Sequence, residues 1–384
     1  MKKENVIGLI IYLFIFAFAV VYGLTVLQPH YSNSAMTEVW QYAIYIVGCI
    51  VVGVLASALL FELGHVVGAK VGGYKIVKFT MLYFSIYKAK EKWKVGFKSF
   101  DGLTGETIIV PNYEKKESPN PFPYLLYGPI FNLAWFVGAF VLFVYFKNGK
   151  PLDEDIAYAI LTSGLISAIL FIYDIIPAKL DTTTDGGRIA FIGKNKSRKA
   201  FNDLLVAEYN AKFSDSPIVI AEEDKKAEEK VPDTPEAKLL SVYPLIDEKK
   251  YDEAKSVLEE VLESEKELNH RQYLEAKELQ LYIMVLTTDK EEMTDYYNEK
   301  VSMTLKKEIS SDNTLLSIRT YILLAGLLEG SRSECLYALK GLNKAYKNTA
   351  PSRKHAEVEL FNDALEKVCQ AHPKWELNIY KLYE

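Results

Sequence analysis

The chain has 384 residues, with 45 lysines and arginines against 50 aspartates and glutamates, and a formal net charge of −5. This length predicts two or three domains. The acidic balance, without a basic surface interleaved with aromatic residues, argues against a nucleic-acid-binding protein. The three cysteines, Cys49, Cys335 and Cys369, are far apart and form no CxxC pair, so neither a disulfide framework nor a thiolate zinc site is expected.

Four long stretches in the first half of the chain carry no charge. They are Val6 to Leu27, Val39 to Phe61, Pro121 to Phe146 and Ile156 to Tyr173. Stretches of this length cross a bilayer as helices, and the fourth reaches full membrane length by continuing toward Pro177. The first is longer than the apolar core of a cleaved signal peptide, so a signal anchor is expected. The sequence therefore predicts four transmembrane helices.

The basic residues indicate how these helices are oriented. Lysines precede the first stretch and crowd the connection from Lys70 to Lys116, and lysines and arginines follow the fourth stretch. The segment from Gln28 to Glu38 has no lysine or arginine. By the positive-inside rule, both termini are expected in the cytoplasm. The expected location is a bacterial plasma membrane. His65 and the segment after Tyr173 then lie on the same, cytoplasmic, side.

Strand patterns occupy the connection between the second and third stretches. Apolar residues alternate with lysines at Trp93, Val95 and Phe97. The segment from Val77 to Tyr87 is almost continuously apolar, and Thr107 to Val110 is typical of a further strand. We expect a small membrane-associated antiparallel insert at about residues 73–113, within a membrane domain of residues 1–195. The alternative is an ordinary cytoplasmic loop domain.

The remainder of the chain predicts helices. Residues 196–235 have the composition of a helix followed by an acidic, proline-containing linker. In residues 236–384, Tyr251-x2-Ala254-x3-Leu258-x2-Val261 has the spacing of the second helix of a tetratricopeptide repeat, and Cys335-x3-Leu339-x2-Leu342 repeats that spacing. Since a helix pair cannot bury its apolar face alone, its neighbours must stack. An all-α cytoplasmic domain is expected, either tetratricopeptide-like or an irregular bundle.

The stretch Phe61-Glu62-Leu63-Gly64-His65 ends the second uncharged segment. In the sequence HExxH, the two histidines lie on one helix face and bind a zinc ion, and the glutamate acts as base. Phe61 stands at the first of those positions and cannot bind a metal. Ionisable residues at membrane depth usually indicate function. The alternative is a hydrogen-bonded cluster that holds the second and fourth spans together.

Two further elements follow in chain order. Gly128-Pro129-Ile130-Phe131-Asn132 lies inside the third span, and Asp174-Ile175-Ile176-Pro177 ends the fourth, followed by Asp185-Gly186-Gly187. Pro177 predicts a helix end near Ile176. The paired glycines predict a tight turn after Asp185. Without a ligand role, Asn132 is an interhelical hydrogen-bonding residue and Asp185 belongs to an ordinary turn.

Together these elements resemble the site-2 protease family of intramembrane zinc metalloproteases. Residues 61–65 resemble its HExxH helix, residues 128–132 its GPxxN element, and residues 174–177 with 185–187 its NxxP and LDG element. The strand-rich insert has a counterpart in that family. The resemblance covers about the first half of the chain and implies that His65 and Asp185 are zinc ligands and Glu62 the general base. Phe61 replaces the first histidine, and Asp174 replaces the asparagine.

A catalytic zinc needs three protein ligands and an open position, and His65 and Asp185 supply two. Asp174 or Asp181 is a candidate for the third ligand, whereas Glu62 cannot bind the metal and remain the base. We therefore expect a pseudoprotease that binds a membrane peptide or protein, while the helical domain holds a protein partner.

One alternative is an active intramembrane metalloprotease that uses zinc with an altered ligand set. The other is a non-enzymatic membrane subunit of a peptide-export or transport system.

Overall fold

The computed structural model describes residues 3–33, 38–81, 84–89, 92–97, 105–147, 151–178, 183–195, 198–212, 234–349 and 351–383. The chain divides into two compact units, Met1–Asn202 and Asp203–Glu384. The linker expected within residues 196–235 falls largely outside the described residues, and Asp181 does so entirely.

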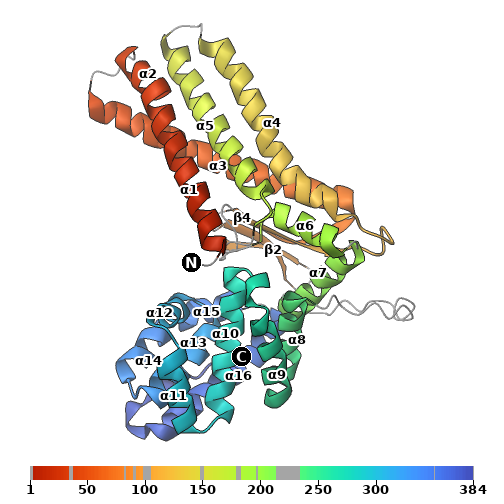
Figure 1. Cartoon of the computed structure of the whole chain (residues 1–384), viewed down its shortest axis with the longest axis vertical. Helices are drawn as coiled ribbons and strands as arrows, with labels where there is room; N and C mark the ends of the chain where they lie inside the picture. Colours follow the sequence, from red (N-terminus) through yellow and green to blue (C-terminus); the bar gives the residue numbers. More distant parts are fainter. Residues whose placement is uncertain are drawn as a thin grey trace. The chain divides into compact units, whose positions relative to one another are not determined.

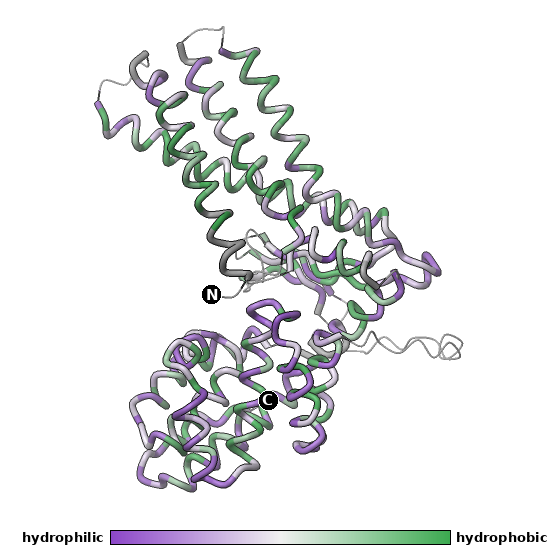
Figure 2. The backbone as a smooth tube through the Cα atoms, viewed as in Figure 1, coloured by the Kyte–Doolittle hydropathy of each residue, from purple (hydrophilic) through white to green (hydrophobic). Residues whose placement is uncertain are grey.

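Long apolar helices dominate the first unit (Figure 1). They are α1 (Lys3–Tyr22), which continues through η1 (Gly23–Leu27) into α2 (Gln28–Asn33), then α3 (Val39–Gly72), α4 (Pro121–Lys147) and α5 (Pro151–Ile175). Four helical stretches are long and apolar enough to cross a membrane, and their backbone is coloured mostly as hydrophobic in Figure 2. The expected four spanning helices are present, and they indicate an integral membrane protein.

Two helix ends differ in how well the sequence predicts them. The fourth span ends at Ile175, two residues before Pro177, whose ring disfavours helical backbone at Ile176. The second span does not end near Phe61 but continues to Gly72, and Gly73 closes it with a φ of 94°. This left-handed backbone favours glycine at the helix end. Glu62 and His65 therefore lie inside a helix and not at its mouth.

Glycines at every fourth position bring α3 into close contact with α4. A Cβ atom added at Gly64 would lie 2.4 Å from the carbonyl oxygen of Tyr127, and one at Gly68 would lie 2.1 Å from that of Pro123. Only residues without a side chain permit such an approach, which is typical of helix pairs within membranes. This contact determines which face of α3 is turned toward α4.

Near the start of α3 and of α5, a buried histidine of α2 contacts both helices. His30 of α2 lies 3.0 Å from the Tyr42 hydroxyl of α3 through Nδ1, and 3.0 Å from Asp155 Oδ1 of α5 through Nε2. The Tyr22 and Thr162 hydroxyls lie 2.9 Å apart. These contacts join the first span to α3 and α5.

The insert between α3 and α4 is a four-stranded antiparallel sheet of order β3-β2-β1-β4. Its strands are β1 (Tyr74–Met81), β2 (Phe84–Ala89), β3 (Lys92–Phe97) and β4 (Gly105–Pro111). The expected sheet is confirmed, although the apolar segment from Val77 to Tyr87 contributes to two strands. In the register, Phe79 of β1 lies between Ile86 of β2 and Thr107 of β4. This order leaves β3 at one edge.

Two shorter helices, α6 (Asp185–Asn195) and α7 (Arg198–Lys212), follow α5. The prediction of a tight turn after Asp185 is wrong, because Gly186 and Gly187 belong to the N-terminal end of helix α6. Gly186 is needed there for close packing, since a Cβ atom would lie 2.1 Å from the carbonyl oxygen of Ile175. The side chain of Asn202 in α7 accepts from the Tyr74 hydroxyl at 2.6 Å and donates to the Pro119 carbonyl at 3.1 Å.

Among its described residues, the second unit consists of helices joined by short turns. Its helices from residue 235 onward are α8 (Pro235–Asp247), α9 (Tyr251–Glu263), η3 (Glu265–Glu267), α10 (His270–Thr287), α11 (Lys290–Lys300), α12 (Met303–Ser311), α13 (Leu315–Leu323), η4 (Leu324–Leu328), α14 (Arg332–Leu339), α15 (Leu342–Asn348), α16 (Pro351–Ala371), η5 (Pro373–Trp375) and η6 (Leu377–Tyr380). Ala254, Leu258 and Val261 are buried on one face of α9. The second repeat-like set spans two helices, because α14 ends at Leu339 and α15 begins at Leu342.

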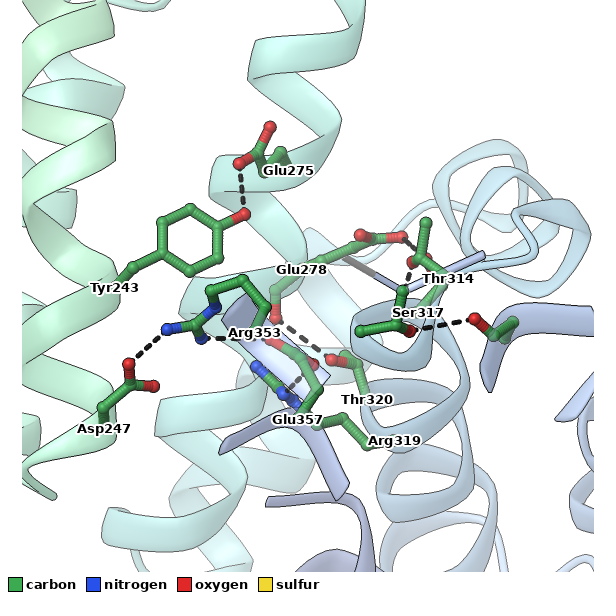
Figure 3. Close-up of polar contacts among 12 residues, drawn as sticks. Tyr243, Asp247, Glu275, Glu278, Thr314, Ser317, Arg319, Thr320, Arg353 and Glu357 are labelled. Atoms are coloured by element: carbon green, nitrogen blue, oxygen red, sulfur yellow. Dashed lines mark hydrogen bonds and ion pairs between the residues drawn. The ribbon is translucent and has the colours of Figure 1, made fainter. Parts of the chain in front are cut away.

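A carboxyl group is buried in the core of this helical unit (Figure 3). Glu278 Oε1 of α10 accepts from the Ser317 hydroxyl of α13 at 2.7 Å, and the same hydroxyl lies 3.0 Å from Asp312 Oδ2. Burial raises the pKa of Glu278 well above its usual value, and the nearby Asp312 raises it further. The folded protein therefore holds Glu278 as the neutral acid over a wider pH range than the unfolded chain does.

Replacing a packed glycine tests the α3–α4 contact. We expect Gly68→Ala to lower the stability of the membrane unit by about 1–3 kcal/mol, because the new methyl group must displace the α4 backbone. Gly48→Ala on the same helix is the control, since nothing lies within 4 Å of its Cβ position. Thermal unfolding of the detergent-purified protein measures both. Equal midpoints for the two variants would contradict the close contact.

The buried carboxyl predicts a pH-dependent stability. Since its pKa is higher in the folded state, the stabilisation is complete below the unfolded pKa, near 4.3, and decreases as pH rises toward the folded value. Glu278→Gln cannot ionise and keeps an acceptor for Ser317. Its unfolding midpoint relative to wild type is expected to increase from pH 5 to pH 8, as measured by scanning calorimetry. Exposed Glu299→Gln is the control, and a difference independent of pH for Glu278→Gln would refute the assignment.

Candidate functional site

The glutamate of the 61–65 segment contacts the sheet. Glu62 is 2% exposed, and its Oε2 accepts from the Thr107 hydroxyl of β4 at 2.6 Å. Gly105 of the same strand lies against it, where an added Cβ atom would be 3.0 Å from Glu62 Oε1. Strand β4 thus holds this carboxyl group in a fixed orientation within the membrane unit.

The histidine of the segment faces the start of α6. His65 Nδ1 lies 2.8 Å from the Tyr124 carbonyl oxygen. A carbonyl only accepts, so Nδ1 carries the proton and donates. The other ring nitrogen, Nε2, lies 3.2 Å from Asp185 Oδ2. In metal-binding histidines the arrangement is the same: one ring nitrogen donates to a backbone carbonyl or another acceptor, and the other binds the metal.

The second motif lies directly against this imidazole. A Cβ atom at Gly128 would be 2.5 Å from His65 Nε2, so only glycine allows α4 to pass this close. Pro129 is accommodated inside α4, and Asn132 follows Gly128 by one helical turn, on the same face. Asn132 is fully buried, and neither its Oδ1 nor its Nδ2 has a hydrogen-bond partner. A buried amide without partners is costly.

The third motif orders the turn between α5 and α6. The backbone N–H of Asp185 donates to Asp174 Oδ1 at 3.2 Å, while Asp174 Oδ2 is buried without a partner. Past Pro177, the Thr184 hydroxyl donates to the Ile176 carbonyl at 2.7 Å and accepts from the Gly187 N–H at 3.1 Å. Asp174 therefore does what an asparagine carbonyl would do at this position, namely accept from the first N–H of a helix.

A polar chain connects the start of α6 to the sheet. Arg188 donates to the Tyr124 hydroxyl at 3.3 Å, and that hydroxyl donates to the Thr107 carbonyl at 2.8 Å. Burial raises the pKa of Asp185, and the positive charge of Arg188 opposes that rise. Residues 61–65, 128–132, 174–178 and 183–187, drawn from three separate parts of the sequence, meet at one place in the structure.

Among the described residues, His65 and Asp185 supply two of the three donors that a catalytic zinc needs. Two ligand atoms of a tetrahedral zinc are about 3.3 Å apart, so the 3.2 Å between His65 Nε2 and Asp185 Oδ2 suits two of the donors. Phe61, at the position of the remaining donor, has its ring edge-on to the imidazole, with centroids 4.6 Å apart and an interplanar angle of 87°. Within the described ranges, no group of three or more His, Cys, Asp or Glu side chains is arranged around a common point suited to a metal.

Sequence reasoning missed two residues of this cluster. Thr107 was expected only as a strand residue, and Tyr124 was expected only as part of an apolar span. A hydroxyl in a strand pattern and a tyrosine in a membrane helix carry no signal of a partner distant in the sequence. Their roles follow from the sheet register and from the close approach of α4 to α3.

No protein-family model, no curated protein and no solved structure matches this chain.

The unpaired amide of Asn132 predicts that removing its polar atoms stabilises the folded protein. Leaving an amide buried without partners costs about 1–3 kcal/mol. We therefore expect Asn132→Leu, which keeps the branched shape and removes the polar atoms, to raise the unfolding midpoint in detergent. Asn202→Leu is the matched control, since it removes two hydrogen bonds of another buried asparagine and should lower the midpoint. A midpoint lowered equally by both changes would show that Asn132 is satisfied in the folded protein.

Proposed function

We propose that this protein is a site-2-protease-like pseudoprotease, which binds a membrane peptide or protein without hydrolysing it. The proposal includes a plasma-membrane location with both termini in the cytoplasm. It rests mainly on one observation, the Phe61 ring packed against the His65 imidazole while His65 and Asp185 face each other. The frame of the site supplies two donors, and a hydrocarbon ring lies where the third would be.

The remaining groups of the site favour peptide binding. The buried Asn132 amide offers both a donor and an acceptor, which match the C=O and N–H of a peptide bond. Its energetic cost inside the membrane unit is offset when a ligand pairs with it. Glu62, held by Thr107, then serves to orient β4 against α3 and carries no catalytic duty.

The open edge of the sheet supports a docking mode for the same client. In the part of the sheet that the structure describes, β3 is an outermost strand, and Trp93, Val95 and Phe97 on it are 54%, 65% and 82% exposed. An unpaired strand edge offers backbone N–H and C=O groups to an extended peptide. Apolar side chains on alternate positions of that strand suit a hydrophobic client.

A second candidate is the active metalloprotease with an altered ligand set. The observation that favours it is the buried Asp174 Oδ2, which has no partner and belongs to a side chain that already bonds to the Asp185 backbone. In that case Asp174 joins His65 and Asp185 as a ligand, and zinc would supply an activated water for Glu62 to deprotonate.

Metal analysis separates the two candidates. We expect the wild-type protein, purified in detergent with zinc present, to hold far less than one zinc per chain. Phe61→His restores the missing donor and is expected to raise zinc content toward one per chain, as measured by mass spectrometry of the metal. The physical reason is the ligand count, since two donors bind zinc weakly and three donors form a catalytic site.

The control is Phe61→Leu, which replaces the ring with an aliphatic side chain and adds no donor. It should leave the zinc content at the wild-type level. The double variant Phe61→His with Asp185→Ala should lose the zinc gained. Stoichiometric zinc in the wild-type protein, lost on Asp174→Ala, would overturn the pseudoprotease proposal in favour of the altered ligand set.

A further inference from the structure

The segment that follows α16 folds back along that helix and is held there by the amide of an asparagine. Leu377–Tyr380 form η6, which packs on α16, and Lys381 continues with the extended backbone angles φ −55° and ψ 136°. The Leu382 N–H donates to Asn362 Oδ1 at 3.0 Å, and Asn362 Nδ2 donates to the Leu382 carbonyl at 2.9 Å. One side chain of α16 thus pairs with both backbone groups of one residue, as a neighbouring strand does in a sheet.

Two side-chain positions add selectivity to this backbone contact. Leu377 is 1% exposed and belongs to the apolar core of the helical unit. Lys381 Nζ lies 3.5 Å from Glu366 Oε2, and Glu366 follows Asn362 by one helical turn on the same face of α16. Because the amide contact is independent of side-chain identity, the pattern that fits this face is an apolar residue and, four positions later, a basic one.

The other contacts of this segment are slight. Ile379 and Tyr383 are 80% and 81% exposed. The ion pair on the surface of α16 is solvated and contributes little in water. The segment from 377 to 383 therefore depends mainly on the Asn362 amide and on the Leu377 side chain.

A strained residue lies at the point where the segment turns back. Glu376 has φ 55° and ψ 35°, a left-handed conformation that is costly for a residue with a side chain. Trp375, just before it, is fixed, because its ring stacks on His372 with centroids 3.9 Å apart and its carbonyl accepts from Arg332 Nε at 3.3 Å. The turn at Glu376 directs the segment onto α16, so detachment of the segment relieves this strain.

We propose that this face of α16 is a binding site for an extended peptide, and that residues 377–383 occupy it as an internal competitor. A partner polypeptide with the same pattern, an apolar residue and then a basic residue followed by leucine, takes their place. The occupant is an extended peptide because Asn362 pairs with the backbone N–H and C=O of a single residue. The inference rests on the proposed function only in taking the helical unit as the part that holds a partner.

The test uses the full chain in detergent and a fluorescent peptide with the sequence of residues 375–383. A tethered segment has an effective concentration in the millimolar range, so weak binding to wild type is expected. Leu382→Pro lacks the N–H that reaches Asn362 and loosens the internal segment. This variant should bind the peptide roughly tenfold more tightly than wild type, as measured by fluorescence anisotropy.

Two second changes in the Leu382→Pro chain locate the binding. Adding Asn362→Leu should remove the gain, whereas adding Lys367→Gln should keep it, since Lys367 is exposed on another side of α16. Binding that does not increase in folded Leu382→Pro would overturn the internal competitor. A gain that survives Asn362→Leu would place the peptide elsewhere and would overturn the site.

A charge variant keeps the test decisive if Leu382→Pro does not fold. Lys381→Glu places a second carboxylate beside Glu366 and leaves the backbone unchanged, so the lysine-containing peptide should bind roughly threefold more tightly than to wild type. Adding Glu366→Lys restores the internal pair with reversed signs and should cancel this gain. Equal binding to all three chains would contradict the proposal. Zinc content does not enter these readouts, so they are independent of the outcome at Phe61.

Discussion

The close approach of α4 to α3 is the constraint on which the membrane unit depends. Gly64 and Gly68 allow the α4 backbone to touch α3, and Gly128 allows it to pass His65. This contact holds the Tyr124 carbonyl at His65 Nδ1 and leaves Nε2 facing Asp185. Side chains at any of these glycines would separate the helices. The chemistry of the site therefore depends on three residues that carry no side chain.

Under the proposed function, Phe61 and Asp174 are two departures from the site-2 protease pattern, and the same frame gives them different consequences. Asp174 still accepts the N–H bond at the start of α6, as an asparagine would, so the turn between α5 and α6 is kept. Phe61 offers no lone pair, and its ring lies against the imidazole. On that proposal, Asp174 preserves the geometry of the site, whereas Phe61 leaves it without a third donor.

Much of the fold follows from the sequence because the hydrophobic pattern is strong. Uncharged stretches predict the four spanning helices, alternation around Trp93 predicts β3, and Pro177 predicts the end of α5. The pattern cannot show that α3 continues to Gly72, since charged residues are tolerated once a helix has left the apolar layer. The two glycines after Asp185 led to a wrong prediction of a turn. Glycine also occurs inside helices where two backbones pack closely, as Gly186 does in α6.

The candidate site is predictable only in part. Glu62, His65, Asp174 and Asp185 are indicated together only by the resemblance of their segments to the site-2 protease motifs, and the structure places His65 and Asp174 in contact with Asp185. Thr107 and Tyr124 do not follow, because their contacts depend on the register of β4 and on the depth at which α4 packs.

The most direct test of the central claim is an experimental structure of the unmodified protein prepared with zinc, with anomalous diffraction recorded at the zinc edge. The account predicts no anomalous peak between His65 Nε2 and Asp185 Oδ2, a direct contact near 3.2 Å, and the Phe61 ring against the imidazole. A zinc peak bound by His65, Asp185 and a third protein donor would contradict it.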